Sequence, residues 1–102
     1  MSILDFFKKK NSVSLNSKMF GGGDGSTEQN AVIINASSSL VGIPAEYEFI
    51  QSKFGAKGRD WELEQQMQYD KNSRSYDIME IKLSNGISKK IFFDITNFYG
   101  KF

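Results

Sequence analysis

Residues 61–96 carry the feature that most constrains the fold, because apolar and polar side chains alternate along three consecutive segments. This period of two is typical of β-strands with one buried and one solvated face. The segments are WELEQQMQYD, SYDIMEIKL and ISKKIFFDIT, and the short stretches KNSR and SNG lie between them. SNG between two such segments is a strong hairpin signal, so this part of the chain is predicted to form an antiparallel sheet.

The hairpin at SNG has a predictable register. A three-residue loop over residues 84–86, with Gly86 in the left-handed conformation, pairs Leu83 with Ile87. A two-residue turn would instead pair apolar with polar residues, because a slip of one residue exchanges the two faces of a strand. We therefore expect the three-residue loop with a bulge at Gly86.

The strand that begins at residue 61 is expected to be half-buried. Its apolar side would carry Trp61, Leu63, Met67 and Tyr69. Its other side would be polar and solvated, and would consist of Glu62, Glu64, Gln66, Gln68 and Asp70. Such a side is a candidate surface for binding a partner.

A helix is predicted over the segment IPAEYEFIQSKFG. Pro44 suits the first helical position, where its missing N–H has no helical partner to lose. Gly55 suits the C-terminal end of the helix. The apolar residues are spaced by four, three and four, as one face of a helix requires; they are Ile43, Tyr47, Ile50 and Phe54.

A β-branched run at residues 31–36, this helix and the three strands give the order β-α-β-β-β. The predicted fold class is therefore α+β, a single domain over residues 31–102 with a mostly antiparallel sheet and one helix packed on one face. Residues 1–30 are expected to lie outside it, as a short basic head and a linker rich in Gly, Ser and Asn. The stretch FGGGDGS in that linker lacks the Lys of a P-loop, and we interpret it as a flexible joint.

Composition removes several classes of chemistry. The chain contains no Cys and no His, which excludes thiolate nucleophiles, imidazole metal ligands and the commonest general base. No motif indicates a cofactor. Residues 1–23 hold four lysines and one aspartate, whereas residues 24–102 hold nine basic and eleven acidic residues. The predicted domain is thus slightly acidic, which disfavours nucleic acid as a partner because that binding needs clustered cations.

The segment Glu80-Ile81-Lys82 is the sharpest catalytic candidate. An E-x-K on a strand, with an Asp and a helical Glu elsewhere, resembles the PD-(D/E)xK nuclease signature, in which carboxylates hold Mg²⁺ and the Lys helps to activate water. The matching residues would be Glu46, Asp60 or Asp70, Glu80 and Lys82. However, a tight turn follows this strand where those nucleases have a helix. An outward strand side with Glu80 opposite Lys90 gives the same pattern, so a metal-dependent nuclease is kept as an alternative.

The basic head offers a second alternative, a weak contact with an anionic membrane surface. The residues that would make it are Phe6, Phe7, Lys8, Lys9 and Lys10. The apolar residues of MSILDFFKKK precede its lysines, the reverse of a signal peptide, and no apolar run reaches the roughly 20 residues of a membrane span. We therefore expect a cytoplasmic protein.

The order of the segments ILDFFKKK, GGGDGS, AVIINA, GIPAEYEFI, DWELEQQ, YDIMEIKL and FFDITNFYGK resembles a group of small bacterial α+β proteins without an assigned activity. The resemblance implies a compact bacterial domain and names no chemistry. The main functional prediction is a non-catalytic protein-binding module, such as an adaptor or an immunity protein that neutralises a toxin. Besides the polar strand side, the predicted contact residues are the aromatic residues near the C-terminus, namely Phe98, Tyr99 and Phe102.

Overall fold

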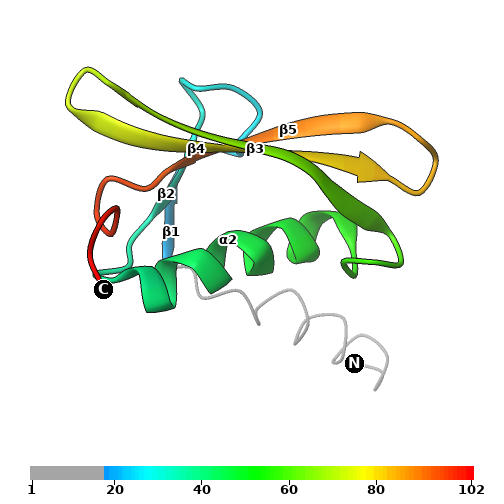
Figure 1. Cartoon of the computed structure of the whole chain (residues 1–102), viewed down its shortest axis with the longest axis horizontal. Coiled ribbons are helices and arrows are strands. Elements are labelled where there is room, and N and C mark those ends of the chain that lie inside the picture. Colours follow the sequence, from blue (N-terminus) through cyan, green and yellow to red (C-terminus); the bar gives the residue numbers. More distant parts are fainter. Residues whose placement is uncertain (1–17) are drawn as a thin grey trace, which may run out of the picture.

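A five-stranded sheet with one helix across one of its faces forms the protein (Figure 1). The computed structural model describes residues 18–102. The elements in chain order are β1 (Phe20–Gly22), β2 (Val32–Ile34), α2 (Ser39–Phe54), β3 (Trp61–Lys71), β4 (Arg74–Leu83) and β5 (Ser88–Asp94). This arrangement confirms the predicted α+β fold with a mostly antiparallel sheet.

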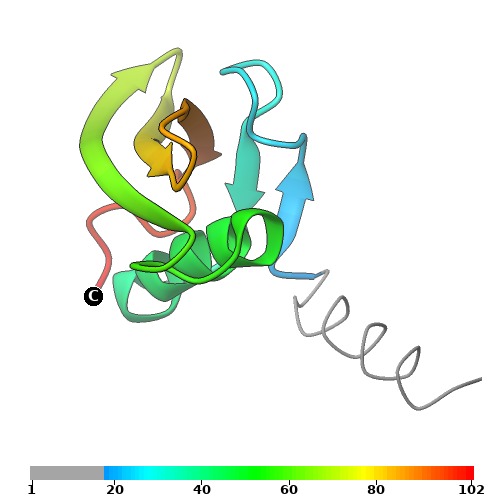
Figure 2. The same ribbon diagram turned by 90° about the vertical axis from the view of Figure 1, so that its right-hand side faces the viewer.

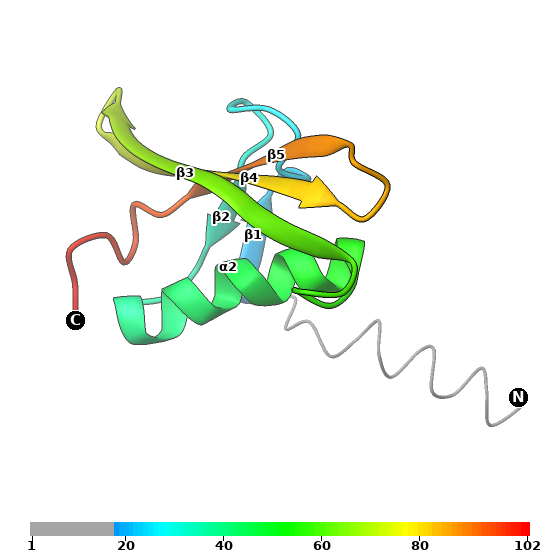
Figure 3. The same cartoon turned by 45° about the vertical axis from the view of Figure 1, so that its right-hand side comes forward.

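The strands lie in the order β1-β2-β5-β4-β3, and β2 and β5 form the one parallel pair among the described strands. After β2 the chain passes through α2 beneath the sheet and returns as β3 at the opposite edge (Figures 1 and 3). Strands β3, β4 and β5 then follow as two hairpins. The helix therefore lies under the sheet and connects one half of it to the other.

The core lies between α2 and the sheet. Ile34, Ile50, Met79, Ile81 and Phe93 are fully buried there. Burying such side chains is the main favourable term in folding, at about 1.5–3 kcal/mol each.

The turn between β4 and β5 has the predicted register. The Leu83 amide donates to the Ile87 carbonyl at 2.8 Å, and Glu80 lies opposite Lys90. Gly86 has a φ of 89°, in the left-handed region that favours glycine. The three-residue loop is thus confirmed, because the pairing of apolar residues decided the register.

The pairing of β3 with β4 shifts by one residue between Leu63 and Gln65, which makes Glu64 the extra residue of a β-bulge. Before the bulge, Trp61 and Leu63 lie on the side of the sheet that faces α2, and Leu63 pairs with Ile81. A bulge places two residues opposite one and reverses the alternation beyond it. The sides of the second half of β3 are therefore exchanged relative to a regular strand.

Beyond the bulge, Gln66 pairs with Met79 and Gln68 with Asp77, so both glutamines lie on the α2 side. Met67 and Tyr69, which were expected on the buried side, lie on the outer side instead. The prediction of one continuous polar side on even-numbered residues is wrong. It assumed a regular strand, and alternation alone carries no signal for an inserted residue.

The helix starts earlier than predicted. It begins at Ser39, so Pro44 lies inside it and not at its first position. Its buried face consists of Gly42, Ala45, Glu46, Phe49 and Ile50. Ile43, which the predicted apolar stripe included, is 48% exposed. A proline inside a helix leaves the carbonyl four residues earlier unbonded, and here that residue, Leu40, is 80% exposed and open to water.

The glycine-rich stretch belongs to the sheet within the described residues. Phe20–Gly22 forms β1 and pairs with β2, so the ordered fold begins before residue 31 and the linker was predicted too long. Gly25 is buried, and its carbonyl accepts a hydrogen bond of 2.8 Å from the Phe92 amide of β5. A Cβ at Gly25 would meet the side chains of Ile91 and Val32 at 2.9 and 3.1 Å. Close approach to the core, and not a free joint, explains this glycine.

Candidate functional site

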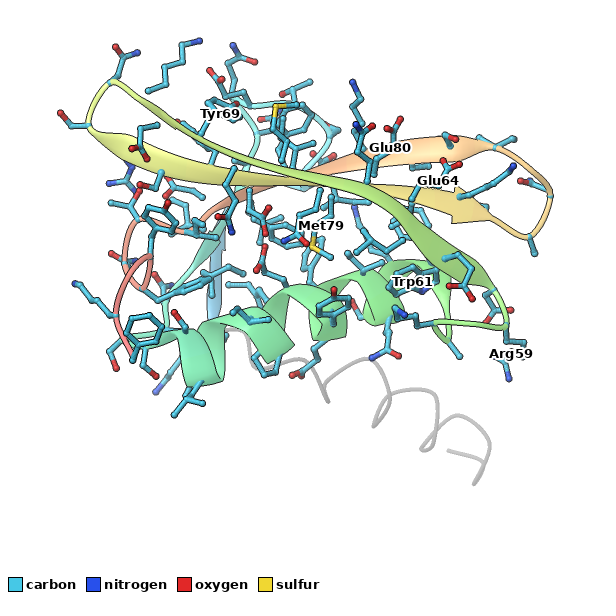
Figure 4. All side chains as sticks on the ribbon, in the orientation of Figure 1. Arg59, Trp61, Glu64, Tyr69, Met79 and Glu80 are labelled. Carbon is cyan, nitrogen blue, oxygen red and sulfur yellow. The ribbon has the colours of Figure 1, made fainter. Side chains whose placement is uncertain are left out.

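The residues of the predicted nuclease site do not converge. Figure 4 shows Glu80 on the outer side of the sheet, away from α2. Lys82 lies on the same side at the end of β4, since it pairs with Glu62. Glu46 is on the opposite side, buried beneath the sheet. A two-carboxylate metal site needs its ligands around one ion, and among residues 18–102 no group of three acidic side chains is placed to hold one.

The two candidate aspartates have local roles at opposite ends of β3. Asp60 Oδ2 accepts hydrogen bonds from the Ala56 amide at 2.8 Å and from the Arg59 guanidinium at 2.8 Å. The Arg59 hydrogen bond, with that of Ala56, lowers the pKa of Asp60. Asp70 accepts a hydrogen bond of 2.7 Å from the Ser75 hydroxyl. Asp60 thus closes the turn before β3, and Asp70 braces the β3–β4 hairpin.

Glu46 and Asp77 form a buried pair of carboxyl groups between α2 and β4. Their side chains belong to residues that are 2% and 0% exposed. Gln66 Nε2 donates a hydrogen bond of 2.8 Å to Asp77 Oδ2. The bulge at Glu64 makes this contact possible, because it turns Gln66 to the α2 side.

A proton on Glu46 would satisfy the two carboxyl groups. Glu46 Oε2 and Asp77 Oδ1 are buried, and neither oxygen has a hydrogen-bond partner among the described residues while both groups are ionised. Burial, with the hydrogen bond to Asp77 and its charge, raises the pKa of Glu46 to about 10. Glu46 is therefore a neutral acid at pH 7, and its proton can serve Asp77 as a hydrogen-bond donor. Burial also raises the pKa of the neighbouring Tyr47. Neither carboxyl group is exposed enough to meet a substrate, so the pair is structural.

The predicted polar strand side is divided between the two faces of the sheet. Glu62 and Glu64 remain on the outer side, where Glu64 Oε1 accepts a hydrogen bond of 2.7 Å from the Ser88 hydroxyl. Gln66 and Gln68 lie on the α2 side, as does Asp70. The acidic residues of β3 are thus spread along its length and do not form one flat face.

A cavity of about 270 Å³ lies where β3 begins and the β4–β5 hairpin turns. Its walls carry charges of both signs from Arg59, Glu62 and Lys82. Within the described chain these groups match no catalytic arrangement, because none of them is paired with a nucleophile or a second carboxylate in the cavity wall. The cavity therefore does not outweigh the exposed surfaces as a candidate site.

The aromatic residues near the C-terminus have different positions. Phe98 is 2% exposed and packs against Gly42 of α2, so it is a core residue and not a contact residue as predicted. Tyr99 is 47% exposed and Phe102 is 96% exposed. The Ser39 amide donates a hydrogen bond of 2.6 Å to the Lys101 carbonyl, which ties this segment to the start of α2. Figure 1 shows the C-terminus beside the first turn of the helix.

An apolar patch surrounds this junction. Among the described residues, seven large hydrophobic side chains are exposed, and five of them belong to the first turns of α2 or to the C-terminal segment. These five, called the apolar patch below, are Leu40, Val41, Ile43, Tyr99 and Phe102. Exposed apolar side chains gathered in one region of a folded protein commonly mark an interaction site.

Sequence reasoning missed the helical part of the apolar patch. A helix that begins at Pro44, as predicted, leaves Leu40 and Val41 in a loop and places Ile43 in the core. A signal was present, because Ser38 or Ser39 before an apolar run can begin a helix as well as Pro44 can. Asp77 and Gln66 carried no such signal, since a buried aspartate on an alternating strand looks like a solvated one.

The membrane alternative rests on residues 1–10, which lie outside the described residues. Within residues 18–102, no helix has the length and apolar character that a membrane span needs. Comparison with protein-family models, with curated proteins and with solved structures finds no match. The functional proposal therefore depends on the surface of the molecule.

Proposed function

We propose that the protein is a non-catalytic binding module for another protein, and that the apolar patch is its contact surface. The observation that carries this proposal is the concentration of five of the seven exposed large hydrophobic side chains at one junction. Exposed apolar residues scattered singly are ordinary, whereas a cluster is costly in water unless a partner covers it.

The apolar patch has the composition of an interface centre. Leu40 and Phe102 are 80% and 96% exposed, so each can bury most of its side chain against a partner. At about 25 cal/mol for each Å² of apolar surface buried, such anchors supply much of the binding free energy. An adaptor and an immunity-type protein would both use a surface of this kind.

Photo-crosslinking in the native cell tests the proposal. A photoreactive residue at position 40 is expected to give a discrete adduct with one protein after illumination. The matched control is the same residue at position 48, because Glu48 is exposed on the same helix outside the apolar patch. With the crosslinker retained at Leu40, the changes Ile43→Ser and Phe102→Ser should each weaken the adduct.

Two results would contradict the proposal. One is an equal pattern of adducts from positions 40 and 48, which would indicate random collisions. The other is an adduct that survives both serine substitutions unchanged. Because these side chains are exposed, the substitutions should leave the free energy of unfolding nearly unchanged, so a lost adduct would report binding and not folding.

A further inference from the structure

Strand β3 is an edge strand with an open outer side. It is the last strand in the sheet order, and Figure 2 shows no strand beyond it. At its start, the Gly58 amide donates to the Trp61 carbonyl at 2.7 Å, and Lys57 forms a short bridge to Trp61. Past this point, no hydrogen bond from the described residues covers the outer backbone edge of β3.

The direction of the free backbone groups follows from the neighbouring ladders. The Ile95 amide donates to the Ser75 carbonyl, and the Ser84 amide donates to the Asp60 carbonyl. Odd-numbered residues of β4 therefore bond β5, and even-numbered residues bond β3. The β3 residues opposite odd-numbered partners direct their N–H and C=O groups outward; beyond the bulge these are Gln66, Gln68 and Asp70.

This open edge is regular and long enough for a further strand. The bulge at Glu64 lies at one end of it, and residues 65–71 pair with β4 without interruption. Natural edge strands are usually blocked by proline, lysine or a bulge within the exposed stretch. Residues 65–70 contain neither proline nor lysine, so their backbone is available for pairing.

The negative charge along the β3 edge favours a partner segment with basic residues. Residues 62–70 contain three acidic residues and no basic one. Lys71 follows them, but its ammonium group is held by Glu28 at 2.9 Å. The carboxylates of Glu64 and Asp70 accept hydrogen bonds of 2.7 Å from the uncharged hydroxyls of Ser88 and Ser75. Both negative charges thus flank the open edge without a cation bonded to them in the described structure.

We infer that the β3 edge binds an extended segment of a partner protein that carries Lys or Arg at both ends and adds as a sixth strand. This inference rests on the proposed function in taking the partner to be a protein, but it concerns a surface separate from the apolar patch. Backbone hydrogen bonds to Gln66, Gln68 and Asp70 supply the affinity, as in other strand-addition complexes. Basic side chains near Glu64 and Asp70 fix the position of the segment.

A second copy of this chain fits the edge poorly. A two-fold pairing would join two edges that each carry Glu62, Glu64 and Asp70 and no basic residue within 62–70. Bringing charges of one sign together across a strand pair is destabilising. A basic segment from a different protein has no such repulsion.

A synthetic peptide provides the probe. We choose the capped peptide Lys-Thr-Val-Thr-Val-Lys, which can form backbone hydrogen bonds as an extended strand. Its two Lys side chains point to opposite faces, as Glu64 and Asp70 do. Added to the full-length protein, it is expected to slow hydrogen exchange at the amides of Gln66, Gln68 and Asp70. Two control peptides separate the contribution of backbone hydrogen bonds from that of charge. One has alternate backbone nitrogens methylated, and the other has Glu in place of both Lys.

A matched pair of variants tests the edge itself. In Gln68→Pro the lost N–H is one that points outward, so the ladder to β4 is kept and the variant should fold. It should weaken peptide binding by about tenfold or more, because one well-made hydrogen bond is lost and the proline ring occupies the space beside it. Gln68→Ala keeps the amide and should bind the peptide as the natural protein does.

Each outcome decides the inference. Slowed exchange at the three amides, lost on backbone methylation and in Gln68→Pro, supports it. Equal binding of the methylated peptide, or no slowed exchange at millimolar peptide, overturns it, and so does a dimer that Gln68→Pro dissociates. Leu40→Ser should not alter peptide binding. A failure here therefore leaves the apolar patch untouched, and a failed crosslink at position 40 leaves this edge untouched.

Discussion

At the scale of single residues, Glu46 has the most unusual environment in the described chain. Its pKa is raised to about 10 from an ordinary value of 4.5, so the folded protein keeps a proton that the unfolded chain releases. Folding therefore takes up a proton between these two pH values, and stability must fall as the pH rises through that window. We predict that the free energy of unfolding decreases from pH 5 to pH 9, by at most about 1.4 kcal/mol for each pH unit.

The substitution Glu46→Gln checks this cause. A glutamine has the same shape, and its amide can donate to Asp77 without a titrating proton. The variant is expected to show a nearly flat dependence of the unfolding free energy on pH, measured by urea denaturation with the fluorescence of Trp61. Glu48→Gln, at an exposed site of the same helix, should keep the natural slope. An unchanged slope in Glu46→Gln would show that another group titrates.

At the scale of elements, Gly42 determines how the C-terminal segment packs on α2. A Cβ at this position would overlap the ring of Phe98, which is buried against the helix. Forcing extra volume into a packed site typically costs about 1–3 kcal/mol. We predict that Gly42→Ala lowers the free energy of unfolding by an amount in this range and shifts the NMR signals of the Phe98 ring and of the Lys101 amide.

Gly86 provides a contrasting case in the β4–β5 turn. Its φ of 89° disfavours any side chain, but a Cβ there would meet no atom within 4 Å. Gly86→Ala should therefore cost only the conformational part, about 1 kcal/mol, with the turn and the core signals otherwise unchanged. Chemical denaturation of Gly42→Ala and Gly86→Ala under the same conditions separates the steric cost from the conformational cost. A larger loss in Gly86→Ala than in Gly42→Ala would contradict the assignment of steric overlap at Gly42.

The elements also show which parts of the fold could be predicted from the sequence. The β4–β5 hairpin was predictable to the residue, because SNG and the matching of apolar residues act over a short distance. The bulge at Glu64 was not, since inserting one residue preserves the alternating pattern of the sequence while exchanging its faces. The start of α2 was misplaced for a similar reason: Pro44 is a local signal, and burial of Gly42 against Phe98 is not local.

The candidate surfaces were predictable in kind and only partly in position. Glu62, Glu64, Tyr99 and Phe102 are exposed, as their predicted role as contact residues requires, and the role itself stays a prediction. Whether Phe98 or Phe102 is exposed depends on contact with a helix more than 40 residues earlier in the chain, which no local pattern encodes. The open backbone edge of β3 has no side-chain signal at all, because strand order is a property of the assembled sheet.

At the scale of the whole molecule, one contact on the outer side of the sheet joins the β1–β2 loop to strand β3. Glu28, in the loop between β1 and β2, accepts hydrogen bonds from the Tyr69 hydroxyl at 2.6 Å and from the Lys71 ammonium group at 2.9 Å. Both partners lie on β3, at the far edge of the sheet from β1. The bond to Tyr69, with that to Lys71, lowers the pKa of Glu28, and burial together with Glu28 raises the pKa of Tyr69 to about 12.

We predict that Glu28→Ala frees the β1–β2 loop without unfolding the sheet. The loop is held elsewhere by hydrogen bonds such as those from the Gly25 amide to the Asn30 carbonyl and from the Phe92 amide to the Gly25 carbonyl. Hydrogen exchange should become faster at these two amides, while the Ile95 amide, which bonds Ser75 between β4 and the end of β5, should keep its rate. Gln29→Ala, at the neighbouring exposed position, is the matched control.

The same contact gives a pH dependence of opposite sign to that of Glu46. Because the pKa of Glu28 is lowered below its ordinary 4.5, its contribution to stability is present above that value and is lost as the pH falls through the folded pKa. Acidification from the ordinary value of 4.5 down through the lowered pKa of Glu28 should therefore shift the NMR signals of Tyr69 and the loop before the core signals change. Tyr69 signals that move only with global unfolding would show that Glu28 does not hold the loop to β3.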